Sequence, residues 1–386
     1  MDNNKTYLVP DYFFDFHCKM GECRTACCEG WPISISLKDY FSLLSAEVSR
    51  DMRIKLDCAL HIAPNPSPEA YAQILPRYDG RCPMRMDDGR CAIHYEIGEF
   101  SLPNVCRLYP RGVRRSECSC ANSCEAVVEL FMERDEKIAF QTALLDFGMT
   151  DIPERKHFFE NAGMEDEIRM HLIRVMQDRT YTLPGRIARL GMTLKALSEA
   201  LNIKDQDEVK RIVSGQMEIS LPAHMNPGHD DLLRGLEMAG KMLSILDERS
   251  DSIRDYGEKA LSAFGSGEHE YEVYTRNKAL FETAFPEWDT WFEHLIVNHM
   301  FFAQFPFQDR PIELGDEYLS LISVYVLLRF LLIGNAEKDY PKEKCADISA
   351  AVFRLVEHTE FDRYAGPMLI NICEDSYENA RRMICL

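Results

Sequence analysis

The sequence lacks several features that would assign it to a large class of proteins. Its first residues, MDNNKTYLVPDYFF, contain no basic start followed by an apolar run, so we expect no signal peptide. Its longest apolar stretch, residues 319–333, is shorter than the roughly 20 residues of a membrane span, and Arg329 interrupts it. No strand-like runs alternate with helices, and no glycine-rich loop follows a strand. These absences predict a cytoplasmic protein with a buried apolar helix and without a doubly wound sheet.

Basic residues are fewer than acidic ones, and the difference is confined almost entirely to the part of the chain after residue 124. The chain of 386 residues has a net charge of −19. Residues 1–124 contain 15 basic and 16 acidic side chains, whereas the remainder contains 29 and 47. An acidic surface repels nucleic acids and membranes rich in anionic lipids, so we expect neither as a partner. The acidity would suit a basic partner or a lysine-bearing substrate, and it would equally serve solubility alone.

Cysteine is the residue that the chain has in excess. Of 14 cysteines, 11 lie between Cys18 and Cys124, and Cys345, Cys373 and Cys385 lie near the end. A chain without an export signal is expected to stay in a reducing compartment, where disulfides are rare. We therefore interpret the first group as metal ligands and the last three as inert buried thiols.

The spacing of the clustered cysteines supports metal binding. It reads Cys18-x4-Cys23-x3-Cys27-Cys28 and then Cys82-x8-Cys91-x14-Cys106-x17-Cys124. Eight thiolates suffice for two four-cysteine sites, or for one site with structural or redox thiols beside it. Zinc and iron–sulfur clusters both accept four thiolates, so spacing does not choose between them. We rank Cys58, Cys118 and Cys120 below these eight, and His94 is a weaker candidate as an alternative ligand or a hydrogen-bond donor to one.

Helical periodicity dominates the rest of the sequence, which predicts a mainly α protein. We expect a cysteine-rich, loop-dominated metal domain over residues 1–125 and an acidic all-α domain over 126–386, possibly divided near 220–270. A short strand is expected at 33–37, capped into a helix by Ser36 or Asp39, and a helical turn at 70–75. The other expected helices begin near 126 and cover 38–50, 158–177, 183–201, 207–216, 232–246, 271–285, 288–304, 319–333 and 348–356.

Several sequence blocks resemble the flagellin lysine-N-methylases. These blocks are FHCKMGECRTACCEGW at 16–31, CPMRMDDGRCAIH at 82–94, CRLYPR at 106–111 and SCEA at 123–126, with looser echoes at 293–307 and 353–358. The first half also resembles the cysteine-rich zinc- or iron-chelating domain family. The resemblance implies methyl transfer from S-adenosylmethionine to lysine side chains of flagellin, and a [4Fe–4S] cluster bound by cysteine.

The chain departs from these families at two points. Glu125 stands where the family usually has proline, and the Cys-x3-Cys-x2-Cys motif of radical S-adenosylmethionine enzymes is absent. A direct displacement, which needs a neutral lysine amine and a site for a sulfonium cation, is therefore the simpler mechanism. For that site we consider aromatic and carboxylate side chains, although core packing explains them as well: Trp288, Trp291, Glu293, Tyr325 and the phenylalanines of 301–307. His294, His299, and His358 with Arg354 are further candidates with an equally ordinary structural explanation.

Two other functions fit the cysteine blocks. One is a non-enzymatic metal-binding or redox module, and the other is a zinc-stabilised scaffold for protein interaction. The ligand set that we predict under all three is Cys18, Cys23, Cys27, Cys28, Cys82, Cys91, Cys106 and Cys124.

Overall fold

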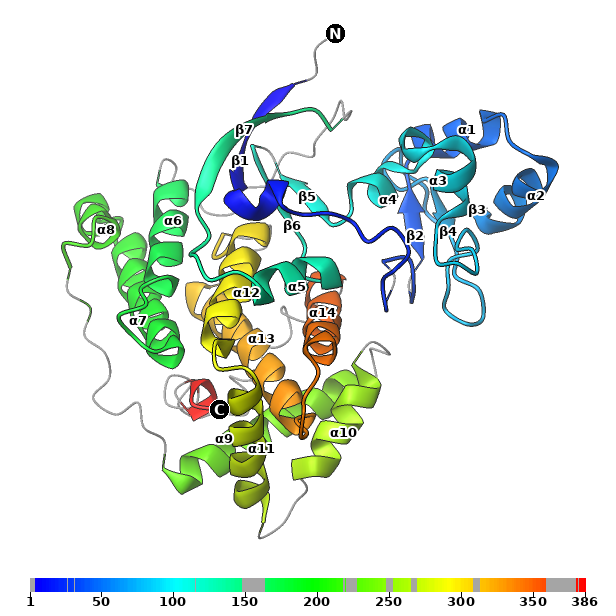
Figure 1. Ribbon diagram of the computed structural model, residues 1–386. Helices are drawn as coiled ribbons and strands as arrows, with labels where there is room; N and C mark the ends of the chain where they lie inside the picture. Colours follow the sequence, from blue (N-terminus) through cyan, green and yellow to red (C-terminus); the bar gives the residue numbers. More distant parts are fainter. Residues whose placement is uncertain are drawn as a thin grey trace.

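The computed structural model describes residues 4–25, 27–30, 32–114, 116–147, 164–217, 219, 228–247, 253–264, 269–307, 313–358, 380 and 382–386. Within them the chain forms a small lobe, residues 33–108, beside a larger helical lobe (Figure 1). The α-helices are α1 (Leu37–Ser45), α2 (Arg50–Ala59), α3 (Ala92–Ile97), α4 (Asn104–Leu108), α5 (Glu125–Met132), α6 (Glu165–Met176), α7 (Leu183–Asn202), α8 (Gln206–Val213), α9 (His229–Asp247), α10 (Arg254–Phe264), α11 (Glu270–Ala284), α12 (Trp288–Phe302), α13 (Leu314–Gly334) and α14 (Lys342–His358). The strands are β1 (Lys5–Pro10), β2 (Ile33–Ile35), β3 (Leu60–Ile62), β4 (Ala72–Ile74), β5 (Arg111–Arg114), β6 (Glu117–Cys120) and β7 (Phe140–Leu145).

The small lobe is built on a three-stranded antiparallel sheet in the order β2-β4-β3. Alternate residues of β2 and β4 face inward, so Ile33, Ile35, Ala72 and Ile74 are buried together. The Ser36 hydroxyl accepts a 3.1 Å hydrogen bond from the Asp39 amide and starts α1 as an N-cap. The buried cluster of this lobe is separate from that of the large lobe.

The large lobe begins with a four-stranded sheet in the order β5-β6-β1-β7. Strand β1 pairs parallel with β6 and antiparallel with β7, from Lys5 opposite Leu145 to Pro10 opposite Phe140. The chain therefore starts in the large lobe, leaves it to build the small lobe, and returns at β5. The segment that makes the crossing contains Cys18, Cys23, Cys27 and Cys28.

Helix α13 forms the centre of the large lobe. It is buried on nearly all sides, and it packs against α7, α9, α10, α11 and α14. It is the one described helix that is long and apolar enough to cross a membrane, but that apolar window is entirely buried inside the protein. The expectation of a buried core helix at 319–333 is confirmed, and the helix extends further at its start.

The prediction of a mainly helical protein is confirmed, with differences in the first third. The expected loop-dominated character of residues 1–125 is not confirmed, because this part contains short helices and strands of both sheets. The helix expected over 38–50 ends at Ser45, and α2 follows it as a separate helix. The helical turn expected at 70–75 is wrong, since β4 lies there. Residues 158–163 of the expected helix at 158–177 lie outside the described residues.

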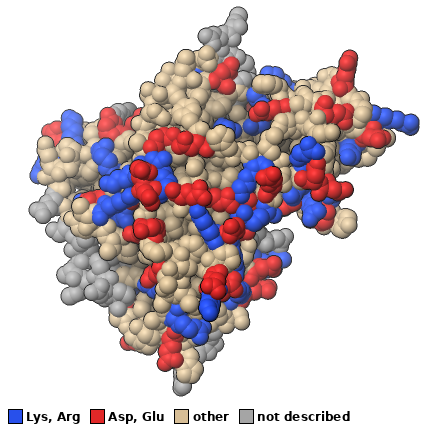
Figure 2. Space-filling view, in the orientation of Figure 1, with Lys and Arg blue, Asp and Glu red and all other residues tan. Residues whose placement is uncertain are grey.

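The predicted division at residue 125 stays a prediction. The buried cluster of the large lobe includes Tyr7, Tyr12 and Phe16 as well as residues from Cys118 onward, and that of the small lobe covers Ile33 to Ile93. On the face shown in Figure 2, acidic and basic side chains alternate and form no single acidic area.

Candidate metal centre

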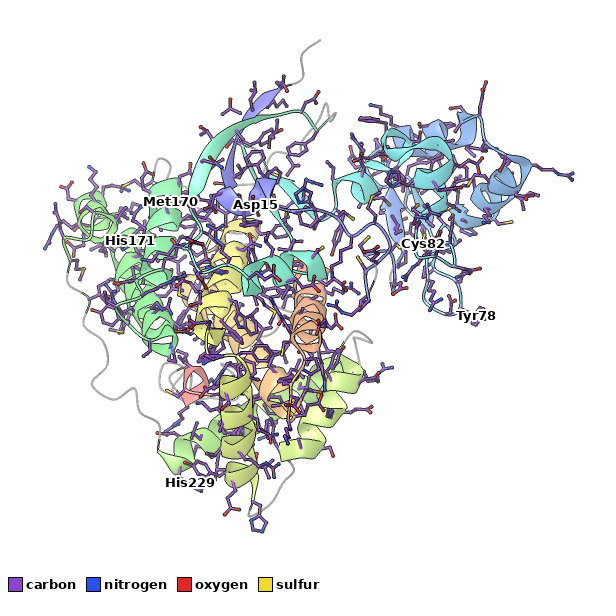
Figure 3. The ribbon with its side chains drawn as sticks, in the orientation of Figure 1. Asp15, Tyr78, Cys82, Met170, His171 and His229 are labelled. Atoms are coloured by element: carbon purple, nitrogen blue, oxygen red, sulfur yellow. The ribbon has the colours of Figure 1, made fainter. Side chains whose placement is uncertain are left out.

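The eight predicted ligands lie in the crossing segment, in the small lobe and at the start of α5. Cys18, Cys23, Cys27 and Cys28 lie in the crossing segment, and Cys82 lies in the loop after β4. Cys91 and Cys124 are the N-cap residues of α3 and α5, and Cys106 lies inside α4. Figure 3 shows Cys82 among the elements of the small lobe. All eight are free thiols.

Cys28 has two thiol neighbours. Its side chain hydrogen-bonds with those of Cys27 and Cys82, and these two contacts lower the pKa of Cys28. The same contacts, with burial, raise the pKa of Cys27 and of Cys82. These three thiols thus lie within hydrogen-bond contact of one another, and metal binding to thiols releases their protons.

Burial raises the pKa of four further thiols, those of Cys23, Cys91, Cys106 and Cys124. It is the largest cause of the raised pKa of Cys23, to about 11, and of Cys106 and Cys124, each to about 12. Backbone N–H groups at the start of α3 and α5 interact with the thiols of Cys91 and Cys124 and oppose this rise in pKa. Amide donors of this kind stabilise thiolates, which are the ligand form of cysteine.

Eight free cysteine thiols supply the donor atoms that zinc and iron–sulfur clusters bind. Within the described ranges, however, no group of three or more His, Cys, Asp or Glu side chains is arranged to hold a metal ion. The predicted ligand set therefore stays a prediction. Of the lower-ranked cysteines, Cys58 is exposed on α2, while Cys118 and Cys120 are buried in β6 within the large core.

Glu125 holds the crossing segment, although the sequence marked it only as a departure from the family. Its buried carboxylate accepts hydrogen bonds from the backbone N–H of Arg24 at 3.2 Å and of Thr25 at 3.1 Å. It also pairs with the Lys19 ammonium at 2.9 Å. The Arg24 guanidinium in turn pairs with Glu129 and Asp347, each at 2.8 Å. Segment 19–25 is thus fixed to α5 and α14.

Two glycines bring the crossing segment against the Cys82–Cys91 loop. Both Gly21 and Gly89 have positive φ, +131° and +84°. A Cβ added at Gly21 would lie 2.8 Å from the carbonyl carbon of Gly89, closer than real Cβ atoms approach. The two cysteine-bearing loops therefore meet backbone to backbone, which only glycine permits.

Helix α14 holds the loop that precedes Cys124. The Glu357 carboxylate accepts hydrogen bonds of 3.0 Å from the backbone N–H of both Asn122 and Ser123. Arg354 donates to the carbonyl oxygens of Ser123 and Thr25, at 3.3 and 2.8 Å. Burial raises the pKa of Glu357 to about 7. Through these contacts Arg354 stabilises the loop. The side chain of His358, the other candidate on this helix, lies outside the described residues.

The candidates for a donor or substrate site lie in the core. Glu293 is fully buried and binds the guanidinium groups of both Arg179 and Arg186. Arg329 covers the ring of Trp288, with its guanidinium carbon 4.0 Å from the ring centroid. Trp291 and Tyr325 are buried around Phe292.

The remaining candidates also make internal contacts. His294 contacts the Phe131 carbonyl oxygen at 3.3 Å, and His299 packs on Phe353. Phe301, Phe305 and Phe307 are buried in the large core. Core packing accounts for the contacts described, and a part for these side chains in donor binding stays a prediction.

Comparison with known proteins places the helical part of the chain in a family. Residues 169–386, more than half of the chain, match the family described as the FliB lysine N-methylase C-terminal domain. A lysine-N-methylase of Salmonella choleraesuis and one of Salmonella typhimurium are each 27% identical over 107 residues. These matches cover 28% of this chain and about a quarter (26%) of each relative's own length. The flagellar biosynthetic protein FliU of Salmonella muenchen is 26% identical over 107 residues, 28% of this chain and 62% of FliU. No solved structure matches.

Proposed function

Because this chain belongs to the family of the FliB lysine N-methylase C-terminal domain, we propose that it is a protein lysine N-methyltransferase. The observation that carries the proposal is the family match over residues 169–386, supported by relatives named lysine-N-methylase. Flagellin is the proposed substrate, because the family and the relative FliU carry flagellar names. S-adenosylmethionine is the proposed methyl donor.

The proposed reaction is a direct displacement. The lysine ε-amine must first lose its proton, because only the neutral amine has a free lone pair. Its nitrogen then bonds to the donor's methyl carbon as the bond from that carbon to the sulfonium sulfur breaks. The sulfur keeps the electron pair, S-adenosylhomocysteine leaves, and the methylated amine remains an ammonium ion, so the one proton released is the proton that the substrate amine first gave to water. The protein's task in such a reaction is to hold the two reactants in line and in reach.

We also propose that the ligands of a [4Fe–4S] cluster come from the eight predicted thiols, with zinc as the alternative metal. Bound there, a cluster would supply one-electron chemistry, whereas zinc would only stabilise the loops. Free thiols in this number fit a reducing compartment, so we propose the cytoplasm, with no nucleic acid or membrane as partner. A visible absorption spectrum with iron, sulfide and zinc analysis of protein purified without oxygen separates the two metals, since zinc thiolates are colourless.

The alternative is a non-enzymatic metal-binding, redox or zinc-stabilised interaction module. It is favoured by the internal pairing of Glu293 and by the loop contacts of Arg354, which leave neither side chain available for chemistry. Labelled S-adenosylmethionine and flagellin, incubated with the anaerobically reconstituted protein, separate the two functions. Label in flagellin supports the methyltransferase, and its absence from flagellin with a fully loaded protein supports the module.

A further inference from the structure

We propose that the buried guanidinium of Arg329 is the centre of a carboxylate-binding site in the large lobe. The residues of this site come from α11, α12 and α13, far along the chain from the predicted cysteine ligands. Its ligand is a small carboxylate, either a free anion or the amino-acid carboxylate of the proposed methyl donor. The second of these sources rests on the proposed function, whereas the first does not.

Four donor groups converge on one main-chain oxygen at this site. The Leu386 carbonyl oxygen accepts a hydrogen bond of 2.6 Å from the Tyr274 hydroxyl and one of 3.3 Å from the Lys278 ammonium. The Arg329 guanidinium donates two more to the same oxygen, of 3.0 and 3.3 Å. A carbonyl oxygen has only two lone pairs, so four donors exceed what it can accept at full strength. Two cations and a phenol are the donors that suit a carboxylate, which has about four lone-pair sites on two oxygens.

Two further donors beside this oxygen have no hydrogen-bond partner among the described residues. They are Nη1 of Arg329 and the hydroxyl of Tyr325, and both side chains are only 1% exposed. Tyr325 precedes Arg329 by one turn of α13, so the two side chains lie on the same face of that helix, and they interact electrostatically. A buried donor without an acceptor is costly. A carboxylate bound here would supply an acceptor to both.

The charges of the site also favour an anion. Arg329 and Lys278 are both cations, and the carboxylate that pairs with Arg329 is that of Glu282, at 3.2 Å. Burial, together with the charge of Arg329, lowers the pKa of Lys278. Charges interact strongly where the protein excludes water, so a carboxylate beside the two cations would offset their mutual repulsion.

The surroundings of Arg329 orient its donors and connect them to solvent. The ring of Trp288 covers one face of the guanidinium, with 4.0 Å between the ring centroid and the guanidinium carbon. This contact leaves the edge of the guanidinium, along which its N–H groups point, for an acceptor. Lys278 and Glu282, one turn apart on α11, are both partly exposed, so an anion can reach the neighbours of Arg329 from solvent.

Thermal unfolding of the full chain in sodium formate, at constant ionic strength, tests the site. A ligand that binds only the folded state raises the melting temperature, and we expect formate to do so for the wild-type chain. The Tyr325→Phe variant should need roughly 10- to 100-fold more formate for the same rise, since it loses a hydrogen bond to a charged group. The substitution removes a hydroxyl that has no partner among the described residues, so the fold itself should persist.

Tyr318→Phe is the matched control, because it makes the same change on the same helix. The Tyr318 hydroxyl donates to the Ile187 carbonyl oxygen at 3.0 Å, so its loss should lower stability but leave the response to formate unchanged. Formate that fails to stabilise the wild-type chain, or that stabilises Tyr325→Phe equally well, overturns the site. Buried water is then the partner of the two donors.

Isothermal titration calorimetry separates the two sources of the carboxylate. S-adenosylhomocysteine carries the amino-acid carboxylate of the proposed donor, and methylthioadenosine lacks it. If the donor is the source, Tyr325→Phe weakens the binding of S-adenosylhomocysteine and not that of methylthioadenosine. A chain that responds to formate but does not bind S-adenosylhomocysteine has a free-anion site, which supports this inference and contradicts the proposed donor. Equal binding of S-adenosylhomocysteine by the wild type and Tyr325→Phe excludes the donor as the source and leaves the methyltransferase proposal intact.

Discussion

The Glu125 carboxylate accepts a hydrogen bond of 3.1 Å from the Thr25 backbone N–H, across 100 residues of sequence. The same carboxylate binds Arg24 and Lys19, so one side chain at the start of α5 fixes the cysteine-bearing segment. Glu125 is itself almost fully buried, so the loss of its carboxylate removes the one acceptor that these three partly buried donors share.

We expect Glu125→Ala to weaken both folding and metal binding. A hydrogen bond to a charged group contributes about 1.5–3 kcal/mol, so the free energy of unfolding should fall by about that amount. Urea titration and a zinc-binding titration measure the two effects. Glu129→Ala is the control, because Glu129 is partly exposed and exposed ion pairs contribute about 0–1 kcal/mol. Equal losses for both variants would show that Glu125 has no special role.

The contact of Gly21 with Gly89 predicts a second difference between matched variants. Gly89→Ala and Gly98→Ala both place a side chain at positive φ, near +85°, which costs about 1–2 kcal/mol. Only at Gly89 would the new Cβ overlap another residue, Gly21, whereas nothing lies within 4 Å at Gly98. We expect Gly89→Ala to lose a further ~1–3 kcal/mol. Chemical denaturation of the two variants measures this, and equal stability would refute the close approach.

Glu293 provides a test of core packing against catalysis. Glu293→Ala leaves the buried Arg186 without its partner, and the breaking of a buried pair costs about 3–5 kcal/mol. We expect a large fall in thermal stability, and recovery of most of it in the double variant Glu293→Leu/Arg186→Met. Asp289→Ala, on the same helix but half-exposed, should change little. A stable Glu293→Ala protein that has lost only methyl transfer would return Glu293 to the catalytic candidates.

His171 on α6, labelled in Figure 3, should make stability depend on pH. Burial, with the charges of Arg174 and Arg189, lowers its pKa to about 4. The unfolded chain binds a proton near the ordinary histidine pKa of about 6.5, so the folded state loses stability as pH falls from there toward 4. We expect a loss on the order of 2 kcal/mol, since His171 is partly exposed. In the His171→Asn variant, the free energy of unfolding should depend less on pH in this range, as measured by chemical denaturation at several pH values. An unchanged dependence on pH would contradict the assignment to His171.

Elements that depend on the residues of one short segment could be predicted from the sequence. The apolar run of α13, the Ser36 cap and the strand at Ile33–Ile35 follow from periodicity and side-chain chemistry alone, and the structure has all three. The three residues of β4 are too few to show a period, and the sequence predicts a helical turn there instead. The pairing of β1 with β7 joins segments more than 100 residues apart, which no local pattern reports.

The candidate metal centre likewise has a part that the sequence predicts and a part that it does not. Clustering and spacing of the thiols could be read from the sequence, whereas their supporting residues could not. Glu125, Gly21 and Gly89 act through partners far along the chain, and the mismatch of Glu125 with the family pattern was the only signal that any of them gave. The core role of Glu293 likewise depends on Arg179 and Arg186, which lie more than 100 residues before it.

Mass analysis of flagellin peptides after incubation with trideuteromethyl-labelled S-adenosylmethionine tests the central claim most directly. The full-length chain, purified and loaded without oxygen, should place the labelled methyl group on lysine side chains, and omission of the chain should abolish it. Flagellin that carries no labelled lysine, after incubation with a folded and metal-loaded chain, would contradict the methyltransferase.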